Sequence, residues 1–165
     1  MANITITGGE NTAKYLTALK AKLATASNVE IGWNKDATYP AGHRNGGDFV
    51  ANVAAINEWG GEWSGTRDDG KPYHVVIPMR PFFRTMVAGA KSQYGLMLYR
   101  ELEANGFDSS KALNALGEII GEELSLTIAT WSEPGNAKRT IARKKIDNPL
   151  VETKLMMTTV NHWVK

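Results

Sequence analysis

The sequence contains no cysteine, which excludes disulfide frameworks, thiolate zinc sites and cysteine nucleophiles. It has no run of about 18 apolar residues, the length that a membrane-spanning helix needs, and its first residues do not resemble a signal peptide. We therefore expect packing or assembly to stabilise the chain, in a reducing, aqueous compartment and without a membrane partner.

Net charge is also small. Nineteen Lys and Arg against seventeen Asp and Glu leave +2, too little to mark the whole chain as a binder of nucleic acid or membrane. The hydrophobic fraction of 42% and the charged fraction of 22% are typical of globular proteins. A chain of 165 residues with this composition predicts a single domain, 1–165.

The hydrophobic pattern predicts an α+β fold, with a mostly antiparallel sheet packed against several helices. We expect strands near Ile4–Ile6, Val29–Trp33, His74–Ile77 and Leu155–Val164, and helices that begin near Glu10, Asp48, Phe83 and Asp108. The last two helices should form a long antiparallel pair, and the first should bury a face with Leu16, Leu19 and Leu23. Flexible loops are expected near 34–48 and 61–73, the second as a hairpin or a flexible arm.

Three segments carry a resemblance to a known family. Val53–Gly60 resembles a pattern A-x-x-N-E-[FW]-G, and Ile77–Arg84 resembles I-P-x-R-P-F-[LF]-R. Asn136–Leu155 is similar to N-s-x-x-T-i-x-x-K-G-x-d-x-P-L-i-d-T-G-x-L. In this order, over residues 29–164, they resemble the neck or tail-completion proteins of tailed bacteriophages, also described as minor tail components or virion morphogenesis proteins.

The sequence departs from this pattern at Lys145 and Lys154, where the family usually has glycine. If those glycines take positive φ, each lysine must either adopt the left-handed conformation or lie in a shifted loop.

The resemblance implies a structural protein of the virion, made in the cytoplasm of the host bacterium and located in the neck, with no enzymatic activity and no cofactor. It implies a ring of sixfold or twelvefold symmetry. One face of the ring would meet the portal or head-tail adaptor protein, and the other the tail terminator or tail-tube protein. DNA would pass through the lumen without sequence-specific contacts.

Four residues near the first two segments are candidate interface residues. Arg80 lies between two prolines that stiffen the backbone, and Glu58 is its predicted carboxylate partner, within the fold or across a subunit boundary. Trp59 and Trp63 are candidate aromatic anchors for a neighbouring subunit, together with Tyr73. Core packing is the alternative for the aromatic residues, and we favour it for Trp131 and Trp163.

The third segment contains five positive charges within eight residues: Lys138, Arg139, Arg143, Lys144 and Lys145. This run is either an ordered interface segment, a contact for DNA or an acidic partner, or a solvated basic loop. The alternative function is a small nucleic-acid-binding protein that uses segment 138–145, and its binding should depend strongly on salt.

Nothing in the sequence suggests an enzyme or a metal site. There is no G-x-S-x-G or H-E-x-x-H motif, and the glycines between Gly42 and Gly47 lack the phosphate-binding pattern. His43, His74 and His162 have no second ligand at metal spacing. An unrecognised hydrolase would need a polar pocket with shifted pKa values around His74 or the carboxylates.

Overall fold

The computed structural model describes residues 8–43, 45–66 and 68–165, so the strand predicted at Ile4–Ile6 lies outside the described part. The described residues form α1 (Gly9–Leu23), β1 (Val29–Trp33), α2 (Val50–Trp59), β2 (Gly61–Thr66), β3 (Pro72–Ile77), α3 (Phe82–Ala104), α4 (Ser109–Thr130), α5 (Lys138–Lys144), α6 (Leu155–Thr158) and β4 (Val160–Val164). The predicted α+β class is confirmed.

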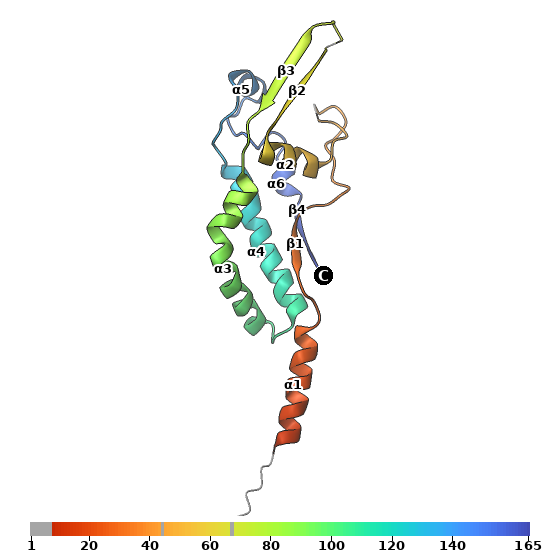
Figure 1. Cartoon of the computed structure of the whole chain (residues 1–165), viewed down its shortest axis with the longest axis vertical. Coiled ribbons are helices and arrows are strands. Elements are labelled where there is room, and N and C mark those ends of the chain that lie inside the picture. The colour runs from red at the N-terminus through yellow and green to blue at the C-terminus, as the bar shows by residue number, and fades with distance from the viewer. Residues whose placement is uncertain (1–7, 44, 67) are drawn as a thin grey trace, which may run out of the picture.

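The long helices α3 and α4 lie side by side and antiparallel, as predicted, and form the centre of the molecule (Figure 1). The carboxylate of Asp108 caps α4 by accepting a hydrogen bond from Lys111 N at 3.2 Å, which lowers the pKa of Asp108. Between the helices, the Tyr94 hydroxyl donates to Glu123. Burial, followed by the charge of Glu123, raises the pKa of Tyr94 to about 12.

The core is formed by one face of α4 and the start of α3, with contributions from α2 and α6. Its most deeply buried large side chains are Phe82, Leu124, Ile128 and Val50. Trp131 is partly buried and packs edge-on against Phe82 with ring centroids 6.5 Å apart, as expected for a core tryptophan. Trp163 is half-buried on β4.

The strands form two small antiparallel sheets. β1 pairs with β4 from Val29↔Val164 to Trp33↔Val160, and β2 pairs with β3 as a separate hairpin. The prediction of a strand over all of Leu155–Val164 was wrong in its first half, where the chain forms α6. Lys154 at φ 65° turns the chain before this helix, and Leu and Met are strong helix formers.

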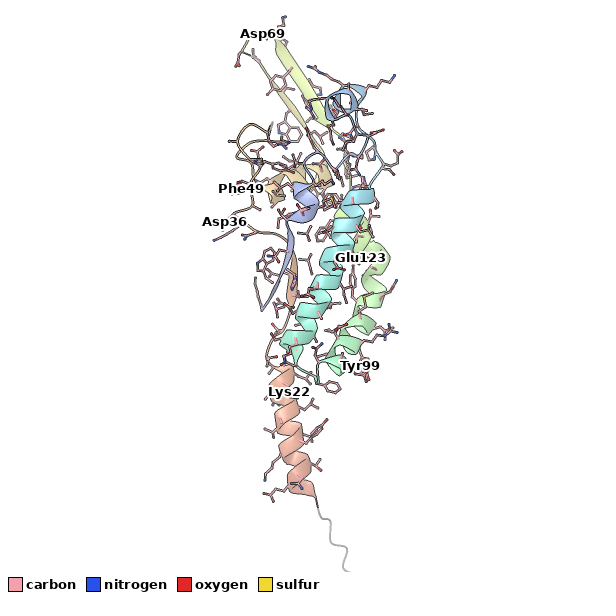
Figure 2. The ribbon with its side chains drawn as sticks, turned by 180° about the vertical axis from the view of Figure 1, so that it is seen from behind. Lys22, Asp36, Phe49, Asp69, Tyr99 and Glu123 are labelled. Atoms are coloured by element: carbon pink, nitrogen blue, oxygen red, sulfur yellow. The ribbon has the colours of Figure 1, made fainter. Side chains whose placement is uncertain are left out.

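The expected burial of the first helix was also wrong. α1 extends away from the rest of the molecule, past the turn between α3 and α4 (Figure 1), and it contains no buried residue. Leu16 is 56% exposed. Lys22, labelled in Figure 2, marks where α1 meets the body, and its Nζ donates to Gly106 O at 3.1 Å. Helical periodicity identifies a face suited to burial, but it does not show that another element of the chain reaches that face.

The β1–β4 ribbon packs directly on α4 at Gly117. A Cβ on Gly117 would lie 2.6 Å from His162 Cδ2 and 2.9 Å from Val29 Cγ2. We predict that Gly117→Ala lowers the free energy of unfolding by about 1–3 kcal/mol in urea titrations, because overpacking outweighs the gain in helix propensity.

Gly95 on α3 provides the matched control, since a Cβ there meets no atom within 4 Å. Gly95→Ala should stabilise the protein by about 0.5–1 kcal/mol. If both substitutions stabilise the protein equally, the ribbon does not pack on α4 in this way.

Candidate interaction site

The junction between α2 and α3 is built around Glu58, which is only 6% exposed. Its carboxylate accepts hydrogen bonds from Phe83 N at 3.0 Å and Arg84 N at 3.2 Å, two amides in the first turn of α3. Helix N-terminal amides have no partner within their own helix, and Pro81 supplies no side-chain cap. Glu58 therefore caps α3 from the end of α2. The partial positive charge at the N-terminus of α3 also stabilises the negative carboxylate.

Arg84, and not Arg80, is the ion-pair partner of Glu58. Arg84 Nε lies 2.7 Å from Glu58 Oε1, and its Nη2 donates to Glu58 O. The predicted Glu58–Arg80 pair is therefore not formed. Arg80 and Arg84 are one helical turn apart in the sequence, and their spacing alone did not reveal which of them faces Glu58.

Arg80 instead connects the junction to the segment that follows α4. Its side chain donates from Nε to Pro134 O at 3.0 Å, from Nη2 to Gly135 O at 3.2 Å and from Nη1 to Asn57 Oδ1 at 3.0 Å. Arg80 is only 5% exposed, and this burial lowers its pKa. Arg80 and Glu58 thus hold α2, α3 and the 134–135 turn together.

An exposed patch covers the junction. Trp59 is 63% exposed, and the Arg84 guanidinium carbon lies 3.9 Å from the centre of its ring. The Arg84 Nη2 also lies 3.4 Å from the sulfur of Met79, which is half-exposed. A tryptophan and an arginine stacked at the surface are the residue types most enriched in the energetic centres of protein interfaces.

The β2–β3 hairpin projects from this junction, with Asp69 at its far end (Figure 2). Trp63 pairs with Val75, and Gly65 with Tyr73, so the large side chains of these pairs share one face. We call Trp63, Tyr73 and Val75 the aromatic face of the hairpin. All three side chains are exposed.

The opposite face of the hairpin, which we call the polar face, carries Glu62, Ser64 and His74, together with Val76, which is also exposed. There, Ser64 Oγ lies 2.8 Å from His74 Nδ1, and Glu62 lies 3.9 Å from His74 Nε2. His74 is thus exposed on an open strand face, not in the polar pocket that the hydrolase hypothesis requires. Segment 61–73, expected as a hairpin or a flexible arm, is a paired hairpin over most of its length.

The basic run forms the short helix α5 and its C-cap, not a loop. Lys144 Nζ donates to Asn148 O at 2.8 Å, and Arg143 lies 3.6 Å from Glu152. Lys138, Arg139 and Lys145 are exposed, and so is Arg143, whose side chain is 49% exposed despite its ion pair. Lys144 is therefore the most internally committed charge of the run, and the other four face solvent at least in part.

Both lysines at the family's glycine positions take the left-handed conformation. The φ angles are 60° at Lys145 and 65° at Lys154, so the first of the two expected alternatives is the one observed.

A groove of about 310 Å³ connects Arg80 with the start of α5. Ile77 lines it from the base of the hairpin, Ile56 from α2, and Asn136 and Thr140 from the start of the third motif. The structure thus brings residues of all three motifs to one place. Of the predicted site residues, Glu58, Trp59 and Arg80 lie at the junction, Trp63 lies on the hairpin, and the basic residues lie on α5.

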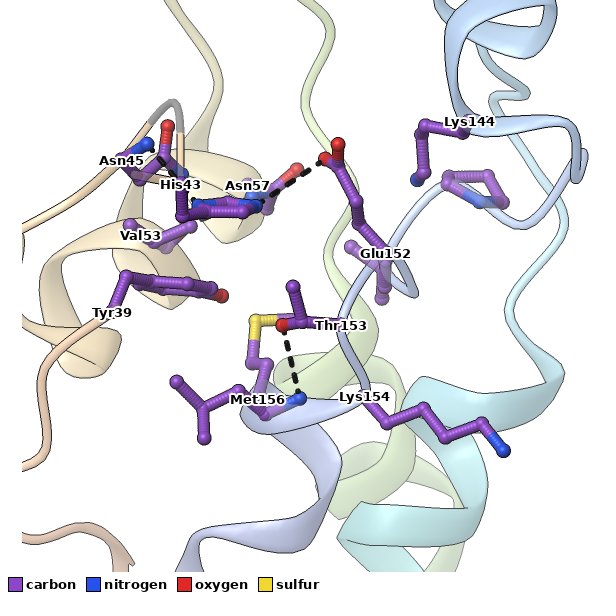
Figure 3. Close-up of a pocket in the computed structure, with 13 residues that line it drawn as sticks. Tyr39, His43, Asn45, Val53, Asn57, Lys144, Glu152, Thr153, Lys154 and Met156 are labelled. Carbon is purple, nitrogen blue, oxygen red and sulfur yellow. Dashed lines mark hydrogen bonds and ion pairs between the residues drawn. The ribbon is translucent and has the colours of Figure 1, made fainter. Parts of the chain in front are cut away.

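A second, smaller pocket was not suggested by any sequence pattern. The ring of His43 stacks on Tyr39 with centroids 4.8 Å apart, and its Nε2 lies 3.9 Å from Glu152 (Figure 3). The pocket has a volume of about 40 Å³, room for only a few water molecules. Its lining residues come from the loop before α2, from α2 itself and from segment 144–156, which are far apart in the sequence, so no local spacing predicts it.

No group of three or more His, Asp or Glu side chains in the described part is placed to hold a metal ion. No helix within it has the length and apolar composition to cross a membrane.

No protein-family model, curated protein or solved structure matches the chain.

Proposed function

We propose that this protein is a structural component of the neck of a tailed bacteriophage, a tail-completion protein that joins head to tail as a subunit of a ring. The main support is the convergence of the three motifs on one junction. Glu58 of the first motif caps the helix that begins in the second, and Arg80 of the second binds the backbone directly before the third.

The exposed arms of the molecule also favour a role in assembly. A two-stranded hairpin is marginally stable alone in water, yet the aromatic face of this hairpin is exposed. Burial of one such aromatic side chain at an interface contributes roughly 1.5–3 kcal/mol. In the proposed ring, the hairpin and the Trp59–Arg84 patch contact neighbouring subunits, the portal or adaptor protein, or the tail terminator or tube protein.

Removal of the gene from the phage that encodes it tests this function. We expect lysates with DNA-filled heads and tails that are not joined, and restoration of infectious particles by a plasmid copy. Plasmid-borne Trp63→Ala/Tyr73→Ala, on the aromatic face, should restore joining poorly. The matched variant Glu62→Ala/Ser64→Ala, on the polar face, should restore it fully. Normal particles without the protein would contradict the proposal.

The second candidate is a nucleic-acid-binding protein, which the exposed Lys138, Arg139 and Lys145 favour. It requires binding to free duplex DNA that weakens steeply with salt, measurable by fluorescence anisotropy. The internal contacts of Arg143 and Lys144 leave fewer charges for phosphate. We therefore place DNA in the lumen of the ring, without sequence-specific contacts.

A further inference from the structure

α1 has an apolar stripe that the described residues of the chain do not bury. Leu16, Leu19 and Leu23 recur at helical spacing along it, with Lys20 on one flank and Lys22 on the other. Leu19 is half-exposed, and Leu16 and Leu23 are exposed. An isolated helix of this length, 15 residues, is marginally stable in water, so α1 needs a partner for this stripe.

The stripe cannot be covered by the body of the same copy in this arrangement. The described hydrogen bonds that join α1 to the body lie at the C-terminal end of the helix and in the residues directly after it. There, Lys22 Nζ donates to Gly106 O, and Ala26 N donates to Ser109 Oγ at 2.9 Å. From there α1 points away from α3 and α4 (Figure 1). The described part of the same copy therefore does not supply the partner surface, which points to another molecule.

α4 offers an exposed apolar stripe flanked by charges of the opposite sign. Ile119 and Leu126 are 38% and 63% exposed and lie, with Glu122 between them, on one outward-facing stripe. Glu118 and the half-exposed Glu123 flank this stripe, and Figure 2 shows Glu123 midway along the helix. α1 carries three lysines and one glutamate, whereas α4 carries three glutamates and one lysine.

We propose that α1 of one copy docks on the Ile119–Leu126 stripe of α4 in a second copy, with its leucines on the apolar side chains and Lys20 near Glu122. The contact rests on the proposed function in one respect: a ring needs two different surfaces on each subunit. Pairing of α1 with α1 would instead bring the flanking lysines of two helices together, which like-charge repulsion disfavours.

The exposed stripe of α3 is a less suitable partner. Leu96 and Tyr99 lie on it, but Arg100 is next to them and the Tyr99 hydroxyl is bonded to Glu103. This stripe provides the matched control for the test.

Sedimentation velocity of the full chain, from micromolar to millimolar concentration, tests the contact. The wild type should form oligomers, whereas Leu16→Asp and Leu126→Asp, each alone, should be monomeric. Mixed in equal amounts, the two variants should form dimers and nothing larger, because each such pair retains one intact contact. Leu96→Asp, the same substitution at an exposed leucine of α3, should assemble like the wild type.

Charge reversal tests the register. Lys20→Glu and Glu122→Lys should each weaken association on the order of tenfold, and the two together in one chain should restore it. Unchanged circular dichroism and urea midpoints, expected for these exposed positions, show that the variants remain folded.

The contact is overturned if the wild type stays monomeric at all concentrations, or if Leu126→Asp alone assembles like the wild type. If the protein is found in particle necks and assembly is insensitive to both aspartate variants, the contact is wrong and the proposed function stands. If copies associate through α1 and α4 but the protein is absent from particles, the contact stands and the proposed function is wrong.

Discussion

Glu58→Ala is expected to lower the free energy of unfolding by about 2–4 kcal/mol, the largest effect that we predict for a single carboxylate. The substitution removes the acceptor for the amides of Phe83 and Arg84 and leaves the Arg84 guanidinium without its carboxylate. The side chain of Arg84 is itself 44% exposed, so solvent screening reduces the share of the ion pair. Loss of the cap at a buried helix end therefore accounts for most of the effect.

Urea unfolding of two further variants separates the cap from the charge. Glu58→Gln keeps one oxygen that can accept from an amide, and it should cost less than Glu58→Ala. Glu62→Ala removes a carboxylate that is 69% exposed and whose contact with His74 is long, at 3.9 Å. This substitution should change the free energy of unfolding by less than about 0.5 kcal/mol. If Glu58→Ala costs no more than Glu62→Ala, Glu58 does not cap α3.

Arg80→Lys is expected to cost about 2–3 kcal/mol despite the conserved charge. The guanidinium of Arg80 donates to two successive carbonyls, of Pro134 and Gly135, and to Asn57. One ammonium group cannot reproduce this fork, and a buried carbonyl that loses its donor is costly.

The control is Arg100→Lys, the same substitution at an exposed position of α3. It should leave the urea midpoint unchanged. Amide hydrogen exchange should also accelerate at residues 135–137, in and directly after the 134–135 turn, in Arg80→Lys and not in Arg100→Lys. Equal midpoints for the two variants would show that Arg80 does not hold the turn.

The sequence predicted the features that depend on local periodicity. The long helix pair follows from apolar residues at helical spacing, and the strand Val29–Trp33 from alternation. The sequence also singled out Glu58 and Arg80 as candidate interface residues, but it paired them with each other, whereas each has other partners in the fold.

Other features depend on tertiary contacts that spacing does not encode. The charge count on α5 could not show that Lys144 and Arg143 turn toward Asn148 and Glu152. The choice of Arg84 as the partner of Glu58 depends on how α3 begins after Pro81. The exposure of α1 could not be foreseen, since its leucine stripe resembles that of a helix packed within its own domain.

The most direct test of the neck assignment is electron microscopy of purified virions or neck complexes, with this subunit identified by mass spectrometry. Our account predicts a closed ring of this protein, with sixfold or twelvefold symmetry, between head and tail. Absence of the protein from the particles, together with tight and salt-sensitive binding to free DNA, would contradict that assignment and favour the nucleic-acid-binding alternative.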